Sequence, residues 1–212
     1  MFENIEVLTH SSIRIKDGEK IIYVDPFNLK GENPKADYIF VTHEHYDHFS
    51  PEDIGKITSD ETVLVVPENM KKKAKEAGIP AARIYIVNPR EKCMIGSLEF
   101  ETVRAYNEGK HFHPKKDEWV GYIINAGGER IYIAGDTDAT EDARAVKCDI
   151  ALVPVGGKYT MDAEEAAELV NTIVPKGAVP THYGSVAGGE EAGEVFAGLV
   201  SEGIETAILK QY

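Results

Sequence analysis

Short apolar and β-branched runs recur along the whole chain and predict many short strands. Helix-start signals lie between some of them: Ser50 precedes Pro51 and an acidic turn, and Asp162 with Glu165 fits a capping box. Further helices are expected over 67–77, 138–146 and 190–201. No linker or repeat divides the chain, so we expect one mixed α/β domain spanning residues 1–212. Runs rich in Ile, Val and Tyr place strands near 5–8, 20–24, 37–42, 62–66, 83–87, 98–106, 119–126, 130–134, 149–155 and 178–181.

Polar residues able to bind metal occur where several of these strands should end. Asp25 follows IIYV, His43 follows YIFVT, Asp136 follows IYIAG and His182 follows AVPT. Side chains presented from the ends of neighbouring strands build a shared site on one rim of a sheet. If these strands are neighbours, the four residues converge.

The loop THEHYDH at residues 42–48 is the densest candidate site. Three of the seven histidines lie within six consecutive positions there. His43 and His45 are two residues apart, so in an extended segment their imidazoles point to the same side. Asp47 and His48 follow where the chain turns towards a helix, and they can face a second point. The pattern indicates metal binding, with room for two adjacent cations.

Two adjacent cations need one ligand that they share, and the second ion needs further ligands of its own. Asp136, in the glycine-containing turn AGDT, is the bridging candidate, and His182 could complete the shell of the second ion. Asp25 is expected to accept hydrogen bonds that fix the histidine loop. Imidazoles suit zinc and carboxylates suit harder ions, so we expect two divalent transition-metal ions, zinc first and manganese, nickel or iron as alternatives.

Composition limits the classes of partner. The chain of 212 residues has a formal net charge of −13, which argues against binding a nucleic-acid backbone. The basic run at 71–75 is expected to be a solvated helix face. No apolar run is long enough to span a membrane and no signal peptide is apparent, so we expect no membrane partner. Cys93 and Cys148 follow no metal or redox spacing, which favours a reduced cytoplasmic setting.

The ordered motifs carry a family resemblance. The HxHxDH segment at 43–48, the earlier Asp25, the GDTD segment at 135–138 and the late His182 resemble the metallo-β-lactamase superfamily. Finer features are similar to a branch of metal-dependent hydrolases related to L-ascorbate-6-phosphate lactonase. The resemblance implies a four-layer αβ/βα sandwich with a dinuclear metal centre at one edge. It also implies that the early His10 lies near the metals.

One ligand position departs from that family pattern. The strand expected to end in a metal-binding histidine ends instead at Asn107, and the nearby histidines are His111 and His113. Both face the same way in an extended segment, so spacing cannot choose between them. We favour His113, because Pro114 should restrain it to an extended backbone, and the resemblance favours the same residue. His111 stays open as the alternative.

Hydrolysis of a small-molecule ester, lactone or phosphoester is the leading functional hypothesis. Two cations lower the pKa of a shared water to about 7 and so supply hydroxide at neutral pH. Asp47 is the catalytic candidate, because it could orient that water or accept its proton. Candidate substrate contacts are His10, Lys158 and Tyr159, with Lys158 suited to an anionic group. A non-catalytic metal-dependent binding protein is the alternative, and a nuclease fits less well because the chain lacks a basic face.

Overall fold

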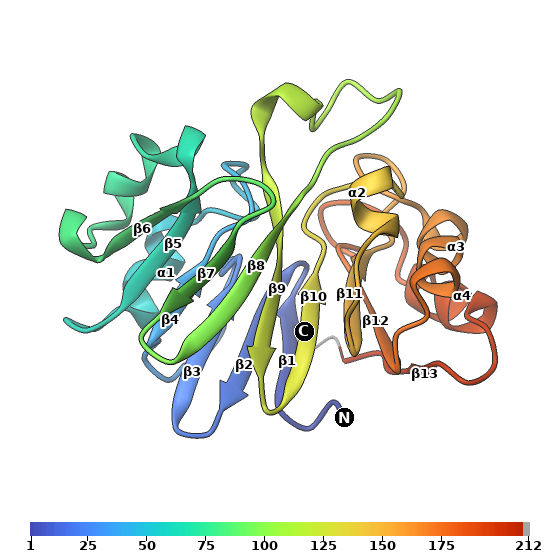
Figure 1. Ribbon diagram of the computed structural model, residues 1–212, viewed down its shortest axis with the longest axis horizontal. Coiled ribbons are helices and arrows are strands. Elements are labelled where there is room, and N and C mark those ends of the chain that lie inside the picture. The colour runs from blue at the N-terminus through green and yellow to red at the C-terminus, as the bar shows by residue number, and fades with distance from the viewer. Residues whose placement is uncertain (210–212) are drawn as a thin grey trace.

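The computed structural model describes residues 1–209, which form two β-sheets with helices on their outer sides (Figure 1). The expectation of one domain over 1–212 extends into residues 210–212, which lie outside the described part. The first sheet has the order β1 (Ile5–Thr9), β2 (Ser12–Asp17), β3 (Lys20–Val24), β4 (Tyr38–Phe40), β5 (Val63–Pro67) and β6 (Ile84–Val87). The second has the order β13 (Glu205–Thr206), β12 (Gly177–Thr181), β11 (Ile150–Pro154), β10 (Glu129–Ile133), β9 (Val120–Ala126), β8 (Leu98–Arg104) and β7 (Lys92–Ile95).

The helices are short and belong to the connections between strands. The α-helices are α1 (Pro51–Ile57), α2 (Glu141–Arg144), α3 (Ala163–Ile173) and α4 (Ala192–Leu199). The 3₁₀ turns are η1 (Glu68–Met70), η2 (Lys73–Ala77), η3 (Ala81–Arg83) and η4 (Lys115–Asp117). No helix in residues 1–209 is both long and apolar enough to cross a membrane.

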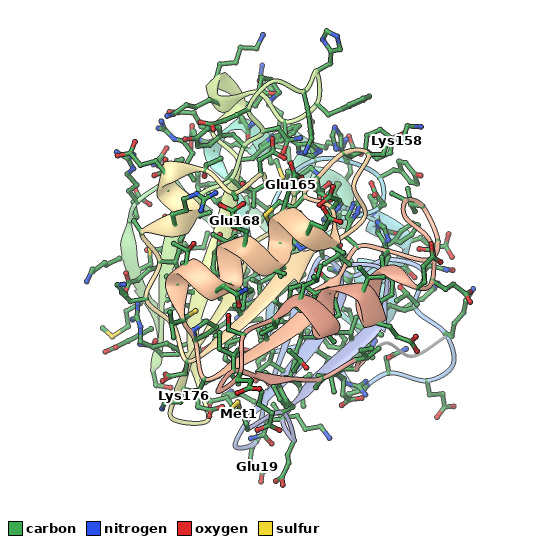
Figure 2. The ribbon with its side chains drawn as sticks, turned by 90° about the vertical axis from the view of Figure 1, so that its right-hand side faces the viewer. Met1, Glu19, Lys158, Glu165, Glu168 and Lys176 are labelled. Carbon is green, nitrogen blue, oxygen red and sulfur yellow. The ribbon has the colours of Figure 1, made fainter. Side chains whose placement is uncertain are left out.

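Three groups of buried side chains define the layers. The first lies between the two sheets, where Phe40 of β4 packs edge-on against Phe100 of β8 and Tyr122 of β9, each at 5.0 Å between ring centroids. The second packs β4 and β5 against α1 and the 3₁₀ turns η1 and η2. The third packs the second sheet against α2, α3 and α4, of which α3 and α4 lie in front in Figure 2. The order helix, sheet, sheet, helix is the four-layer sandwich expected from the resemblance.

Most of the predicted elements are present, with corrections to two helices and three strands. The capping box of α3 is confirmed, since the Asp162 side chain accepts from the Glu165 N–H and the Glu165 side chain accepts from the Asp162 N–H. The helix predicted over 67–77 is wrong, because η1 and η2 occupy that stretch as separate 3₁₀ turns. Strands β2, β7 and β13 were not predicted. The helix expected over 138–146 is reduced to the four residues of α2.

The C-terminal ends of the parallel strands in both sheets lie at the same edge of the molecule. Strands β3 to β6 run parallel in the first sheet, and β10 to β13 run parallel in the second. Asp25 follows β3, His43 comes soon after β4, Asp136 follows β10 and His182 follows β12. The Tyr122 hydroxyl donates to the carbonyl oxygen of Val41 at 2.7 Å and fastens the two sheets beside this edge.

Candidate metal centre

The first group of metal-capable side chains comes from three loops. It contains His43, His45, His113 and Asp136, whose donor atoms all lie within 4.8 Å of one another. His43 Nε2 and His45 Nδ1 are 3.1 Å apart, and His113 Nε2 is 3.2 Å from Asp136 Oδ2. The histidine loop and the segment before β9 therefore meet at one point of the rim.

The second group lies beside the first and contains His10, Asp47, His48 and His182. Its donor atoms also lie within 4.8 Å of one another. Asp47 Oδ2 is 3.3 Å from His10 Nε2, and 3.7 Å from both His48 Nε2 and His182 Nε2. The HxHxDH loop thus contributes two residues to each group, as the change in chain direction after His45 predicted.

Asp136 contacts both groups. Its Oδ2 lies 3.2 Å from His113 Nε2 and 3.8 Å from His43 Nε2 in the first group. The same carboxylate lies 3.2 Å from His182 Nε2 and, through Oδ1, 3.2 Å from His48 Nε2 in the second. This central position is the one required of a ligand that two ions share.

The spacing and orientation of these donors fit metal ligands. Two atoms each about 2.1 Å from one ion in a tetrahedral shell are about 3.4 Å apart, close to the observed separations. His48 Nε2, His113 Nε2, His182 Nε2 and Asp136 Oδ1 are buried, yet none of them makes a hydrogen bond of good geometry. Buried polar atoms rarely lack partners. Their donor atoms lie close together without pairing, which suits cations held between them.

Asp25 fixes the histidine loop from behind. It is fully buried and accepts hydrogen bonds from the backbone N–H of Thr42 at 2.8 Å and from the Thr42 hydroxyl at 2.7 Å. Its Oδ2 also lies 2.7 Å from His48 Nδ1. With Nδ1 paired to a carboxylate, His48 keeps Nε2 for the site, which is the orienting role expected of a residue behind a ligand.

The charges within the site are strongly coupled. Burial lowers the pKa of His48, but the carboxylates of Asp136 and Asp25 outweigh it and raise that pKa well above the ordinary value. Burial likewise opposes the charge on His182, yet Asp136 and Asp47 raise its pKa to about 9. Burial would raise the pKa of Asp136, but His182 and His48 hold it well below its ordinary range. In the metal-free protein, protons on these imidazoles compensate the buried carboxylate.

Four site residues have a left-handed backbone. His10, Asp25, His113 and His182 have φ between 45° and 58°, and they are half of the non-glycine residues with positive φ in the described chain. Such conformations cost on the order of 1–3 kcal/mol each and cluster at functional sites. The neighbouring Gly156 is required by close approach, since a Cβ there would lie 2.4 Å from the His182 carbonyl oxygen. The sharp turns aim the side chains at the rim.

The structure places His113, not His111, among the metal-capable groups. His113 is buried, whereas His111 is exposed in the preceding loop. The extended backbone that we expected at His113 is wrong, because its φ is 58°. Asn107 joins neither group. Its backbone N–H donates to the carbonyl oxygen of His113 at 2.8 Å and its Nδ2 donates to that of Tyr159 at 2.6 Å, so it holds both loops in place.

A cavity of about 190 Å³ opens onto the two groups. Tyr159 lines it as expected of a substrate contact. His10 does not line it; this side chain is buried, and its Nδ1 lies 3.1 Å from the Ser185 hydroxyl. Lys158 is exposed at the surface (Figure 2), with Nζ 4.9 Å from the centre of the Tyr159 ring. A larger hollow of about 590 Å³ lies over β8 and α2, away from every metal-capable residue.

Several functional residues were not predicted from the sequence. Trp119, the only tryptophan, packs against three imidazoles of the first group, with ring centroids 4.9 Å from His43, 4.9 Å from His45 and 5.1 Å from His113. Cavity residues that we did not predict are Tyr46, Phe112 and Val186. The only signal for Tyr46 and Phe112 is that each stands between two residues of a histidine motif.

Comparison with known proteins identifies relatives over most of the chain. The family model described as "Beta-lactamase superfamily domain" matches residues 4–182. A protein of Thermoplasma acidophilum named UPF0173 metal-dependent hydrolase is 34% identical, with 85% of this chain and 84% of that protein covered. A proposed metal-dependent hydrolase from Parabacteroides distasonis has a crystal structure with a TM-score of 0.84 and 31% identity, covering 98% of this chain and 93% of its own. A metallo hydrolase from Ignicoccus hospitalis, 21% identical, has the same fold with a TM-score of 0.75; 97% of this chain and 94% of that one are covered.

Proposed function

The chain belongs to the beta-lactamase superfamily, and we propose that it is a hydrolase whose site holds two divalent transition-metal ions. The observation that supports this proposal is the position of Asp136, which belongs to the first group of four donors and also lies 3.2 Å from His48 and His182 of the second. Relatives named metal-dependent hydrolases support the reaction class. Imidazoles dominate both groups, which favours zinc, while the carboxylates of Asp47 and Asp136 also suit manganese, iron or nickel.

Each residue has a role that follows from its position. His43, His45 and His113 would hold one ion, Asp47, His48 and His182 the other, and Asp136 both. His10 lies against Asp47, and its Nε2 restrains the carboxylate at 3.3 Å.

When bound, such ions would polarise the scissile bond and lower the pKa of a water at the site. Asp47 lines the cavity, and burial of its carboxylate is outweighed by His10 and His182, which keep its pKa well below the ordinary range. Asp47 is therefore ionised at neutral pH and accepts a hydrogen bond from the attacking water. That bond orients the nucleophile towards a carbonyl or phosphoryl group in the cavity.

The test is a substrate panel with defined metals. Metal-free protein would be loaded with zinc, manganese, nickel or iron, and each form assayed against lactones, carboxylic esters and phosphoesters. We expect at least one form to hydrolyse one class. Asp47→Asn also removes a ligand of the second ion, so it is assayed with excess metal, and there we expect kcat to fall by more than about 100-fold. Metal-loaded protein that hydrolyses nothing would instead indicate a metal-dependent binding protein.

A further inference from the structure

The walls of the cavity divide cleanly into metal-capable residues and apolar ones. Five of the nine lining residues belong to the two metal-capable groups. The rest, which we call the apolar collar, are Tyr46, Phe112, Tyr159 and Val186. The collar comes from four separate loops, so its assembly above the metal-capable residues is a property of the fold and not of one sequence segment.

Two rings of the collar are strongly exposed. Tyr46 is 66% exposed and Phe112 is 47% exposed, both at the opening of the cavity. Neighbouring rings hold them in place: Phe112 packs edge-on against Tyr159 at 4.8 Å, and Tyr46 packs against Phe27 at 5.9 Å. Ligand sites typically expose rigid apolar surface beside their reactive groups. A ligand that covers this surface removes it from water, which is favourable.

The collar offers no cationic side chain to pair with an anionic group. Among residues 1–209, no lysine or arginine lines the cavity. Lys110 pairs with Asp138 and donates to the Thr160 carbonyl oxygen, and Lys158 lies over the Tyr159 ring with its ammonium group in solvent. Apart from metal ions, phosphate recognition uses Arg, Lys or helix N-termini, and the collar offers none of these side chains. A net charge of −13 adds no long-range attraction for an anion.

From this arrangement we propose that the substrate is a neutral carboxylic ester or lactone with a short apolar group seated in the collar, in preference to a phosphoester. The proposal rests on the hydrolase function proposed above and names its substrate class. In the reaction the water oxygen adds to the carbonyl carbon and the acyl C–O bond breaks. One water proton reaches the leaving alkoxide, giving an acid and an alcohol, with no change of oxidation state.

A series of γ-lactones with side chains of zero, two and four carbons tests the collar. The comparison compounds are a γ-lactone whose four-carbon side chain ends in a carboxylate, and 4-nitrophenyl phosphate. With metal-loaded protein we expect kcat/KM to rise about fourfold per methylene, which corresponds to ~0.8 kcal/mol. The carboxylated lactone and the phosphoester should be at least about tenfold poorer than the neutral four-carbon lactone.

Collar variants connect that preference to the structure. Phe112→Ala should flatten the dependence on chain length, Phe112→Leu should restore most of it, and both should keep the normal metal content. Tyr85→Ala is the matched control, because Tyr85 is a partly exposed aromatic residue on β6 outside the cavity. Equal or better activity on the charged compounds, or an unchanged chain-length dependence in Phe112→Ala, would overturn the proposal.

Failure of the hydrolase function would be recognised separately. If no lactone, ester or phosphoester is hydrolysed, calorimetric binding of the four-carbon lactone to metal-loaded protein still tests the collar. Binding that is at least about tenfold tighter than that of the carboxylated lactone, and that Phe112→Ala weakens, supports a neutral apolar ligand. Equal binding of the two lactones, or none by either, rejects it.

Discussion

Replacing the shared carboxylate should affect both halves of the candidate centre. Asp136→Ala removes a donor that lies 3.2 Å from His113 in one group and 3.2 Å from His48 and His182 in the other. His43→Ala removes a donor from the first group alone. We therefore expect reconstituted His43→Ala to keep about one metal ion per chain, and Asp136→Ala to keep less than one, because neither group retains its charge balance.

The size of the effect follows from burial. Removing one partner from a buried charged cluster costs about 3–5 kcal/mol, or roughly 10²- to 10⁴-fold in affinity for each ion. In the metal-free protein the same carboxylate, together with Asp47, outweighs burial and raises the pKa of His182 to about 9.

Elemental analysis after reconstitution and dialysis measures the total metal per chain. Tryptophan fluorescence then reports whether the first group holds an ion. Trp119 touches the imidazoles of the first group, so its fluorescence should respond to an ion there. Asp138→Ala is the matched control: it lies in the same turn but bonds to Lys110 and belongs to neither group. Two tightly held ions in Asp136→Ala, or metal loss in Asp138→Ala equal to that in Asp136→Ala, would refute the bridging assignment.

Three further predictions concern the ligands, protons and partners. His113→Ala should lose metal and the fluorescence response while His111→Ala keeps both; the reverse result in metal analysis would identify His111 as the ligand. Because the pKa values of His48 and His182 are raised in the metal-free protein, metal binding must release protons below about pH 9, so chelator competition should show affinity rising about tenfold per pH unit per proton from pH 7 to 9. A pH-independent affinity would contradict this charge assignment. Gel shifts at low salt should show no sub-micromolar binding of short RNA or DNA, given the net charge of −13; salt-sensitive binding would oppose it.

The local sequence was enough for strands with a strong apolar pattern and for the helix caps. It failed at 67–77, where Met70, Ala74 and Ala77 have helical spacing and are buried, yet two 3₁₀ turns form. Lys71 and Lys75, four residues apart, repel each other on an α-helix. Apart from Met70, the stretch buries only the small side chains of Ala74 and Ala77, so packing favours a continuous α-helix only weakly. Strand β7 was missed because KCMI is a short edge strand with half its residues exposed.

The metal-capable residues could be predicted from the sequence, whereas the aromatic residues that pack around them could not. Histidine spacing, strand ends and the family resemblance led to the seven metal-capable residues of the prediction, all of which the structure brings together. Phe112, Tyr46 and Trp119 are ordinary aromatic residues in the sequence. Their position depends on how loops from both sheets meet at one edge, a long-range property that no local pattern encodes.

Backbone strain at the candidate metal centre explains why hydrogen bonds from several segments hold the loops that carry its residues. His10, Asp25, His113 and His182 would each relax to negative φ if their turns were free. They are held instead by cross-links outside the ligand set: the backbone N–H of His182 donates to the carbonyl oxygen of His10 at 3.1 Å, and Asn107 donates to that of His113. Repulsion among the charged imidazoles opposes the same arrangement. Cations placed between the imidazoles would relieve that repulsion, so bound metals would stabilise a geometry that neither the local sequence nor the apolar core favours alone.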